Sequence, residues 1–459
     1  MELNTGCQDA DLPLFSCFCH DNNGRWERKA FGRVPPLLTQ GLNFGIHGSA
    51  GIFCAFFNCI MLTTEAKTSI IKITKYLSED KKMLAQTPPM GWNSWNTFTK
   101  DIDEKMILQM ADAMVDTGLR DAGYEYLVID DCWSEKSRDE NGNLVADHIK
   151  FPHGMKYVAD YVHSKGLKFG MYSCCGVMTC AGYPGSFGHE FEDAKYFAEV
   201  GIDLLKYDNC YHPSMQSQLS YNRMSLALKA SGREILFSMC NWGNASVWTW
   251  ARSVGAHMYR STGDIFDNFP SIRKLSESQM QNLGYSGTGC FNDIDMLVCG
   301  LSGKGNISPG EGCTEGQYRY HFALWCMFMS PLMIGCDIRN MSPEIKGLLT
   351  NPYLLRINQD KEARPPMFVH DNRGYPENII CFRHLSDNEF AIGLFNPYES
   401  KKNIMLPYYE IGLDPLCGYG FELTDCFTGE KLGIAKEYFE ASVEAQDCRV
   451  FLAKLVKVK

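Results

Sequence analysis

The sequence predicts a (β/α)8 barrel followed by a C-terminal antiparallel β-sandwich. From residue 89 onward, short β-rich runs alternate with amphipathic helical stretches, and the alternation repeats eight times. Near Asp360 the helical stretches stop and only short alternating runs remain. Alternation of strands and helices is typical of parallel α/β folds, and eight such units over about 270 residues match a barrel in count and size.

The eight predicted strands are short apolar runs, and several of them end in acidic residues. In chain order they are MGWNSW (90–95), YEYLVIDD (124–131), LKFGMYS (167–173), IDLLKYDN (202–209), EILFSMC (234–240), AHMYRSTGD (256–264), CFNDIDM (290–296) and LMIGCD (332–337). An open doubly wound sheet is the alternative. It is disfavoured because no glycine-rich phosphate loop follows any of these runs.

A helical stretch fills each gap between the predicted strands. In the first, over 103–123, apolar residues recur at helical spacing and Gly118 supplies a stop signal; the apolar residues are Met106, Ile107, Met110, Met114 and Val115. The later stretches are 155–166, 191–201, 221–232, 246–255, 270–284, 317–329 and 342–351. We therefore expect a catalytic barrel over 83–360.

The C-terminal segment, 365–459, has a different sequence pattern from the barrel region. Runs such as NIICFRHL, EFAIGLFNP, KKNIMLPYY, FELTDCFTG and CRVFLAKLVKV are separated by Asn, Gly, Pro and Asp. Short alternating runs with frequent turn residues predict a small antiparallel β-sandwich.

Residues 1–82 carry no sustained periodic pattern. An apolar run at 48–62 is shorter than the roughly 20 residues that a membrane-spanning helix needs. We expect this segment to be an extension outside the core fold, with the working protein beginning near Met83 and no membrane association.

Composition limits the function. The chain has 459 residues, a net charge of −10 and a pI near 5.6, which argues against nucleic-acid binding because that needs a basic face. The 20 cysteines are scattered without the spacing of a zinc site, and we interpret most as buried thiols in a reducing cytoplasm. No metal or cofactor is expected, and a homo-oligomer is left open.

Chemistry-bearing residues gather where the predicted strands end. In a barrel these ends meet at one face, where active sites form. One such acid alone could cap a helix, but acids from four strand ends indicate a site. The set is Trp95, Asp130, Asp131, Tyr172, Lys206, Asp208, Cys240, Trp242, Arg260, Asp264, Asp293 and Asp295.

Converging carboxylates fit either a divalent metal site or glycoside hydrolysis. No histidine ends any of these strands, which disfavours a metal site. Trp95, Tyr172 and Trp242 offer flat apolar faces suited to a sugar ring, while Asp and Arg supply directional hydrogen bonds to hydroxyl groups. The residue types therefore favour sugar hydrolysis.

Six motifs resemble those of glycoside hydrolase family 27, which includes α-galactosidases, or melibiases, and α-N-acetylgalactosaminidases. They are TPPMGWNSWNTF (87–98), YLVIDDCW (126–133), LKFGMYS (167–173), TCAGYPGSFG (179–188), DLLKYDNC (203–210) and FNDIDMLVCG (291–300). The resemblance implies a retaining, exo-acting α-galactosidase that acts by double displacement. The alternatives are α-N-acetylgalactosaminidase or β-L-arabinopyranosidase activity at the same site.

The resemblance also implies residue roles. Asp208 would be the nucleophile and Asp264 the general acid/base. Asp130 and Asp131 would bind the 4- and 6-hydroxyl groups of galactose, Arg260 and Asp295 would hold the 2-hydroxyl side, and Tyr172 and Trp95 would wall the pocket.

Local spacing adds two electrostatic expectations. Lys206 and Asp208 lie two apart on one strand and so point to the same side, and we expect the ammonium to keep Asp208 ionised. The alternative for Lys206 is a structural ion pair. Asp264 has no cation so close in sequence, so we expect it to keep its proton for the leaving group.

Three features differ from the family pattern or depend on setting. Asn241 stands where many members have Glu, and bulky Trp242 favours galactose over N-acetylgalactosamine. Cys180 and Cys210 match a disulfide of secreted relatives, and the sequence leaves open whether they pair or stay reduced. Cys132 has no matching partner in the loop after Trp95.

Overall fold

The structure is a computed structural model that describes residues 83–213, 216–310, 312–370 and 374–458, together with the backbone of two short strands near the N-terminus. These strands, β1 (Ser16–His20) and β2 (Trp26–Ala30), pair antiparallel. The chain divides into one unit over Met1–Lys81 and another over Lys82–Lys459. The apolar run at 48–62 lies outside the described residues, and the expected dispensability of the N-terminal segment stays a prediction.

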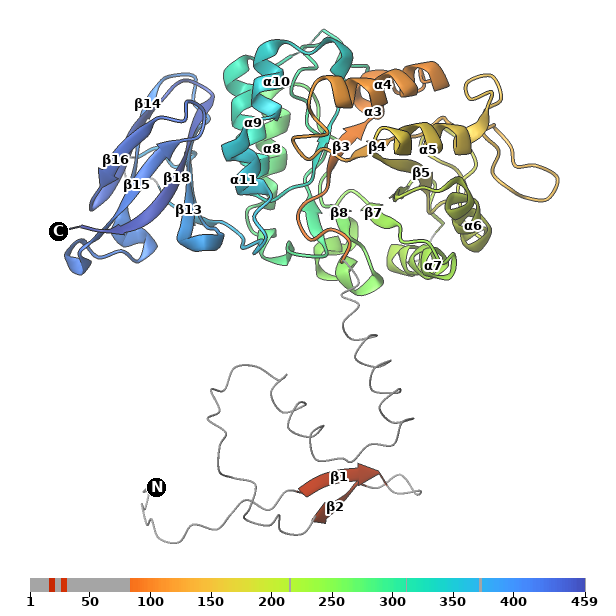
Figure 1. Cartoon of the computed structure of the whole chain (residues 1–459), viewed down its shortest axis with the longest axis horizontal. Helices are drawn as coiled ribbons and strands as arrows, with labels where there is room; N and C mark the ends of the chain where they lie inside the picture. The colour runs from red at the N-terminus through yellow and green to blue at the C-terminus, as the bar shows by residue number, and fades with distance from the viewer. Residues whose placement is uncertain are drawn as a thin grey trace. The chain divides into compact units, whose positions relative to one another are not determined.

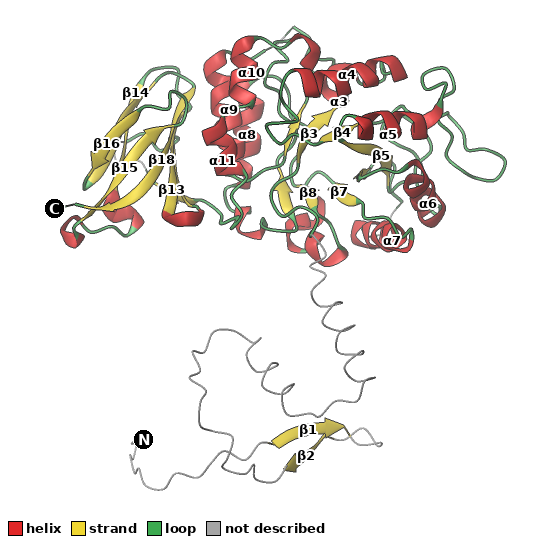
Figure 2. Ribbon diagram, in the orientation of Figure 1, coloured by secondary structure: helices red, strands yellow, loops and turns green. Residues whose placement is uncertain are grey.

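The second unit contains the barrel that the sequence predicts (Figures 1 and 2). Its parallel strands are hydrogen-bonded in the order β10-β3-β4-β5-β6-β7-β8-β9. A parallel bridge between Leu297, just after β9, and Ile334 of β10 joins the two ends of the sheet. Each predicted run holds one strand: β3 (Met90–Asn93), β4 (Tyr126–Val128), β5 (Lys168–Cys174), β6 (Leu204–Asp208), β7 (Leu236–Cys240), β8 (Met258–Arg260), β9 (Phe291–Asp293) and β10 (Leu332–Ile334).

Helices cover the barrel as the periodicity predicts. In α4, Asp103 caps the amino end by accepting a hydrogen bond from Met106 N, and Ile107, Met110 and Met114 are buried. The helices are α3 (Trp95–Phe98), α4 (Glu104–Asp116), α5 (Gly154–Ser164), α6 (Glu190–Val200), α7 (Ser217–Ala230), α8 (Phe269–Gln279), α9 (Glu315–Met327), α10 (Pro343–Leu349) and α11 (Pro352–Asn358).

One predicted helix, at 246–255, is wrong in type. The chain there forms two 3-10 segments, η2 (Asn244–Thr249) and η3 (Ala251–Val254). Ala245 and Ser246 have φ angles of 55° and 51°, so their backbones cannot continue a right-handed helix.

The barrel has two apolar regions. Apolar side chains of the strands fill its interior, among them Val128, Leu204, Leu236, Met258 and Met333. A larger core lies between the strands and the helices, and it includes residues of the C-terminal sheet. The barrel and that sheet therefore share buried apolar contacts.

The C-terminal segment forms the predicted antiparallel sandwich. A six-stranded sheet, β11-β12-β13-β18-β15-β16, accompanies a two-stranded sheet, β14-β17. Alternate residues such as Ile380 and Phe382, or Ile404 and Leu406, are buried between them. The strands are β11 (Met367–Val369), β12 (Ile379–His384), β13 (Glu389–Asn396), β14 (Lys402–Pro407), β15 (Tyr419–Asp425), β16 (Lys431–Ala435), β17 (Tyr438–Val443) and β18 (Asp447–Lys457).

Helix α9 connects the two regions by packing against β13 and β18, and Figure 1 shows α8, α9 and α11 on the side of the barrel that faces the sandwich. Arg319 of α9 forms an ion pair with Asp447. Arg383 of β12 is fully buried and donates hydrogen bonds to the carbonyl oxygens of Ile357 (2.7 Å) and Arg364 (2.8 Å). Among the described helices, none has the length and apolar character needed to cross a bilayer.

Candidate active site

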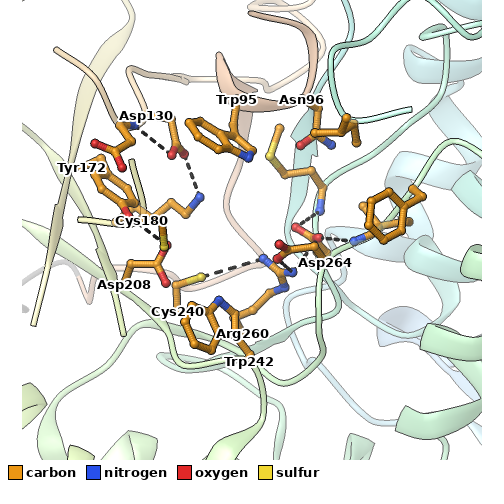
Figure 3. A pocket seen from close by; sticks show the side chains of 17 residues that line it. Trp95, Asn96, Asp130, Tyr172, Cys180, Asp208, Cys240, Trp242, Arg260 and Asp264 are labelled. Atoms are coloured by element: carbon orange, nitrogen blue, oxygen red, sulfur yellow. Dashed lines mark hydrogen bonds and ion pairs between the residues drawn. The ribbon is translucent and has the colours of Figure 1, made fainter. Parts of the chain in front are cut away.

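A pocket opens at the carboxyl ends of the barrel strands (Figure 3). The ten residues predicted for catalysis or sugar binding all line it. They are Trp95, Asp130, Asp131, Tyr172, Lys206, Asp208, Trp242, Arg260, Asp264 and Asp295. The structure thus brings these side chains together, while the role of each stays a prediction.

Two buried carboxylates follow β4. Asp130 Oδ2 accepts hydrogen bonds from Lys206 Nζ at 2.7 Å and from Asn93 Nδ2 at 2.8 Å. Asp131 Oδ2 accepts a hydrogen bond from Ala181 N at 2.9 Å, and burial raises the pKa of Asp131. The pair is therefore fixed in place, one acid by a neighbouring strand and the other by the loop after β5.

The Lys206 ammonium forms an ion pair with Asp130 and not with Asp208. Asp130 follows β4, which lies two positions from β6, the strand of Lys206, in the sheet. Burial alone would lower the pKa of Lys206, but the adjacent Asp130 raises it above its usual value, so the side chain stays protonated. The structural ion pair left open by the sequence is the arrangement found.

Asp208 ends β6 and is only 6% exposed. Burial raises its pKa to about 6, although the Lys206 charge and the hydrogen bond from Asn209 N oppose the rise. Tyr172 Oη donates to Asp208 Oδ2 at 3.1 Å, and Asn209 N donates to Oδ1 at 2.8 Å. The Lys206 charge thus favours the ionised form of Asp208, as expected, but burial raises the pKa of Asp208 by more than this charge lowers it.

Asp264 lies in the loop after β8, and its side chain is 66% exposed. Although no cation is as close to Asp264 in sequence as Lys206 is to Asp208, one lies close in space: Arg260 Nη2 is 2.8 Å from Asp264 Oδ1. The same nitrogen lies 2.6 Å from Asp295 Oδ2. One guanidinium nitrogen of Arg260 therefore contacts both the Asp264 and the Asp295 carboxylates.

Both carboxylate oxygens of Asp295 have protein donors. Oδ1 accepts from Met296 N at 2.8 Å, and Oδ2 accepts from Ile265 N at 2.7 Å as well as from Arg260. The backbone at Asp295 has φ of 92°, rare for a residue other than glycine, and Trp325 Nε1 donates to its carbonyl oxygen at 2.8 Å. Asp295 therefore ties the backbone just after Asp264 to β9.

Aromatic side chains wall the pocket. Trp95 N donates to Asn93 Oδ1 at 2.9 Å at the start of α3, which fixes the turn that presents the indole. Trp242 has φ of 59° and is followed by Gly243, where a Cβ atom would lie 2.3 Å from the carbonyl oxygen of Ser261. The loop after β7 can thus approach the loop after β8 closely only with glycine at this position.

Seven further residues line the pocket, and of these only Cys240 stands among the strand-end residues selected from sequence. Met296 ends a predicted strand, and Ile265 and Phe266 follow Asp264, so adjacency to selected residues was an available signal. Ile307 comes from a loop with no motif of its own. The full set is Asn96, Cys180, Cys240, Ile265, Phe266, Met296 and Ile307.

Cysteine states are mixed. Most described cysteines are buried free thiols, as the sequence analysis expected. Cys180 and Cys210, however, are joined by a disulfide at the edge of the pocket. Cys132 is a buried free thiol.

Two groups of described side chains have donor atoms close enough together to share a metal ion. In the first, Glu135, Asp147 and His148, the imidazole already pairs with Glu135 at 2.5 Å and is 79% exposed, so the contact reads as a surface ion pair. The second, Cys180, Asp208 and Cys210, lies at the pocket.

A parallel eight-stranded barrel whose strand ends present paired acids and aromatic walls is suited to glycoside hydrolysis. Residues 87–360 match the Melibiase_2 family, described as alpha galactosidase A, and the chain belongs to this family.

Individual relatives agree with this assignment. An α-galactosidase of Cyamopsis tetragonoloba is 40% identical over 390 residues, which cover 85% of this chain and 91% of that protein. The crystal structure of α-galactosidase I from Mortierella vinacea superposes with a TM-score of 0.76 at 31% identity, covering 82% of this chain and 99% of that one. The α-galactosidase of Saccharomyces cerevisiae, solved with raffinose, gives a TM-score of 0.74 at 29% identity and covers 81% and 98% of the two chains.

Proposed function

We infer that the protein is a retaining, exo-acting α-galactosidase that hydrolyses terminal α-D-galactosyl residues of galactosides and oligosaccharides by double displacement. Family membership supports the activity. The observation that carries the mechanism is a pair of carboxylates in unlike surroundings at one pocket: Asp208 buried at the end of β6, and Asp264 exposed in the loop after β8.

Asp208 suits the nucleophile. Its donors, Tyr172 Oη and Asn209 N, orient the carboxylate, and it is ionised above about pH 6. In the first step an Asp208 oxygen would attack the anomeric carbon, the glycosidic bond would break, and Asp264 would give its proton to the leaving oxygen. Water, deprotonated by Asp264, would then release galactose with its α-configuration kept.

The contact between Arg260 and Asp264 bears on the acid role. Arg260 Nη2 contacts both Asp264 and Asp295, so one guanidinium group holds the two carboxylates side by side at the pocket. We propose that this contact positions Asp264 for proton transfer to the leaving oxygen.

Substrate recognition would come from the remaining lining residues. Asp130 and Asp131 would bind the 4- and 6-hydroxyl groups, and Trp242 would exclude a 2-N-acetyl group. A sugar without the 6-hydroxymethyl group would not need both acids, which disfavours the arabinose reading. Because the Saccharomyces relative was solved with raffinose, we propose raffinose-type α-galactosides as natural substrates.

Hydrolysis of p-nitrophenyl α-galactoside, compared with the α-N-acetylgalactosaminide and β-L-arabinopyranoside, tests the substrate class. Asp208→Asn should abolish turnover of every substrate. Asp264→Asn should still glycosylate Asp208 with an activated aryl galactoside, should turn over melibiose very slowly, and should yield a β-galactosyl azide when azide is added. Proton NMR showing β-galactose as the first product, or an active Asp208→Asn variant, would refute the mechanism.

A further inference from the structure

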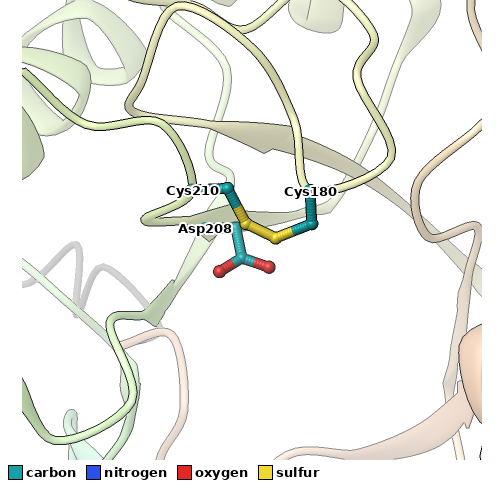
Figure 4. Close-up of side chains that lie close together, drawn as sticks. All are labelled: Cys180, Asp208 and Cys210. Carbon is teal, nitrogen blue, oxygen red and sulfur yellow. A yellow bond between two sulfur atoms is a disulfide. The ribbon is translucent and has the colours of Figure 1, made fainter.

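The side chains of Cys180, Cys210 and Asp208 meet at the edge of the pocket (Figure 4). Cys180 lies in the loop after β5, and Cys210 follows Asp208 by two residues. The two sulfur atoms and a carboxylate oxygen of Asp208 all lie within 4.8 Å of one another. The disulfide therefore adjoins the carboxylate proposed as the nucleophile.

The two sulfurs differ in access. Cys180 is exposed, whereas Cys210 is 7% exposed. A reductant will therefore attack Cys180 Sγ, and Cys210 will leave as a thiolate. With a trialkylphosphine, a phosphorus–sulfur bond forms as the sulfur–sulfur bond breaks, and water then converts the adduct to phosphine oxide and the Cys180 thiol. Phosphorus loses the two electrons that the disulfide gains.

Reduction leaves a donor set that a metal ion can use. Tetrahedral Zn²⁺ with two thiolates and one carboxylate needs donor separations of about 3.5 to 3.8 Å, given metal–ligand distances of about 2.0 to 2.3 Å. The three donor atoms start within 4.8 Å of one another, and rotation of the two cysteine side chains after the sulfur–sulfur bond breaks can bring them to this spacing. Three negative ligands also outweigh the nearby Lys206 ammonium.

We propose that reduction of the Cys180–Cys210 disulfide creates a binding site for a thiophilic divalent cation, Zn²⁺ or Cd²⁺, in which Asp208 is the third ligand. The ion is an inhibitor and not a resident cofactor, because it occupies the carboxylate that attacks the sugar. The inhibition rests on the proposed function, whereas the binding of the ion does not. The oxidised enzyme resists these cations, since disulfide sulfurs are poor ligands.

Neighbouring thiols are less available. Cys174 is buried and its Sγ donates to the carbonyl oxygen of Cys210 at 3.1 Å, while Cys175 Sγ donates to Asn209 Oδ1 at 3.3 Å. Cys240 also lines the pocket, where Arg260 Nη1 lies 3.8 Å from its sulfur. A matched variant, Cys180→Ser/Cys210→Ser, keeps all three of these thiols and the Glu135 group while removing the proposed sulfur ligands.

The experiment titrates Cd²⁺ into full-length protein and follows the ultraviolet charge-transfer absorption of cadmium–thiolate bonds. Phosphine-reduced wild type should bind one additional Cd²⁺ per chain, at least about tenfold more tightly than oxidised wild type or the reduced double-serine variant. Reduced Asp208→Asn should bind Cd²⁺ about tenfold more weakly than reduced wild type. This readout needs no enzyme activity, so it does not depend on the proposed hydrolysis.

Inhibition is then measured with p-nitrophenyl α-galactoside and Zn²⁺. Zinc should inhibit reduced wild type, a chelator should restore the activity, and the oxidised enzyme and the reduced double-serine variant should be unaffected. Equal Cd²⁺ binding by reduced wild type and the double-serine variant, or equal zinc inhibition of oxidised and reduced enzyme, would overturn the proposal. Failure of the oxidised, metal-free enzyme to hydrolyse the galactoside would instead count against the proposed function.

Discussion

Replacing Lys206 by Met should move the acid limb of kcat/KM to higher pH. Asp208 must be ionised to attack, and its pKa of about 6 in the folded protein means that activity is present above this pH and falls as the pH drops through it. The Lys206 charge lowers the pKa of Asp208, whereas Asp130 raises it. Asp130→Asn should therefore move the same limb to lower pH, the opposite direction.

The size of the shift follows from the strand geometry. Residues two apart on a strand are about 6.6 Å apart. Unit charges at that distance interact by about 2.5 kcal/mol at an effective dielectric constant of about 20, which corresponds to roughly two pH units. Relaxation and water entry will reduce this, so we expect Lys206→Met to shift the acid limb by about one to two pH units; for Asp130→Asn only the direction is predicted.

The assay is the pH dependence of kcat/KM with an aryl galactoside, because this ratio reports ionisation in the free enzyme. Lys168→Met is a matched control: Lys168 begins β5 at the other end of the barrel and pairs with Glu125. Its acid limb should not move. This electrostatic account of Asp208 would be refuted if the acid limb of the kcat/KM profile did not move in Lys206→Met. It would also be refuted if the limb moved in the same direction in Lys206→Met and Asp130→Asn.

Three further predictions concern selectivity and stability. If Trp242 narrows the pocket near the 2-position, kcat/KM should favour the α-galactoside over its N-acetylated analogue by at least roughly 2 to 3 kcal/mol, and Trp242→Ala should narrow that gap; equal rates on both substrates with wild type would reject the steric argument. A chain beginning at Met83 should keep full activity and unfold in urea like the full chain, whereas a loss above about 2 kcal/mol would mean that the N-terminal segment packs on the barrel. Arg383→Met should lower the free energy of unfolding by about 2 to 4 kcal/mol, because it leaves the buried carbonyl oxygen of Ile357 and the partly buried one of Arg364 without their donor; a change below about 1 kcal/mol in urea unfolding would contradict this role.

The barrel and the gathering of the site residues could be predicted from sequence because both depend on local order. A strand is recognised by its own apolar run, and parallel strands in a barrel end at one face, so Asp130, Asp208 and Asp295 converge whatever their exact partners are. The segment at 246–255 shows where local reasoning stops. Its apolar spacing suited a helix, but left-handed backbone at Ala245 and Ser246 divides it, and spacing carries no signal for that conformation.

Pairing across the barrel was decided only by the tertiary structure. Sequence spacing correctly placed Lys206 on the same side of β6 as Asp208, yet the ammonium contacts Asp130, 76 residues away, because a barrel brings a third strand within reach. Likewise, one nitrogen of Arg260 contacts both Asp264 and Asp295. Ile307 lines the pocket although it lies in a loop without a recognisable motif. The sequence by itself thus determined which groups meet at the strand ends. Which carboxylate receives which cation, and how far burial raises the pKa of Asp208, depended on distances and desolvation that exist only in the folded chain.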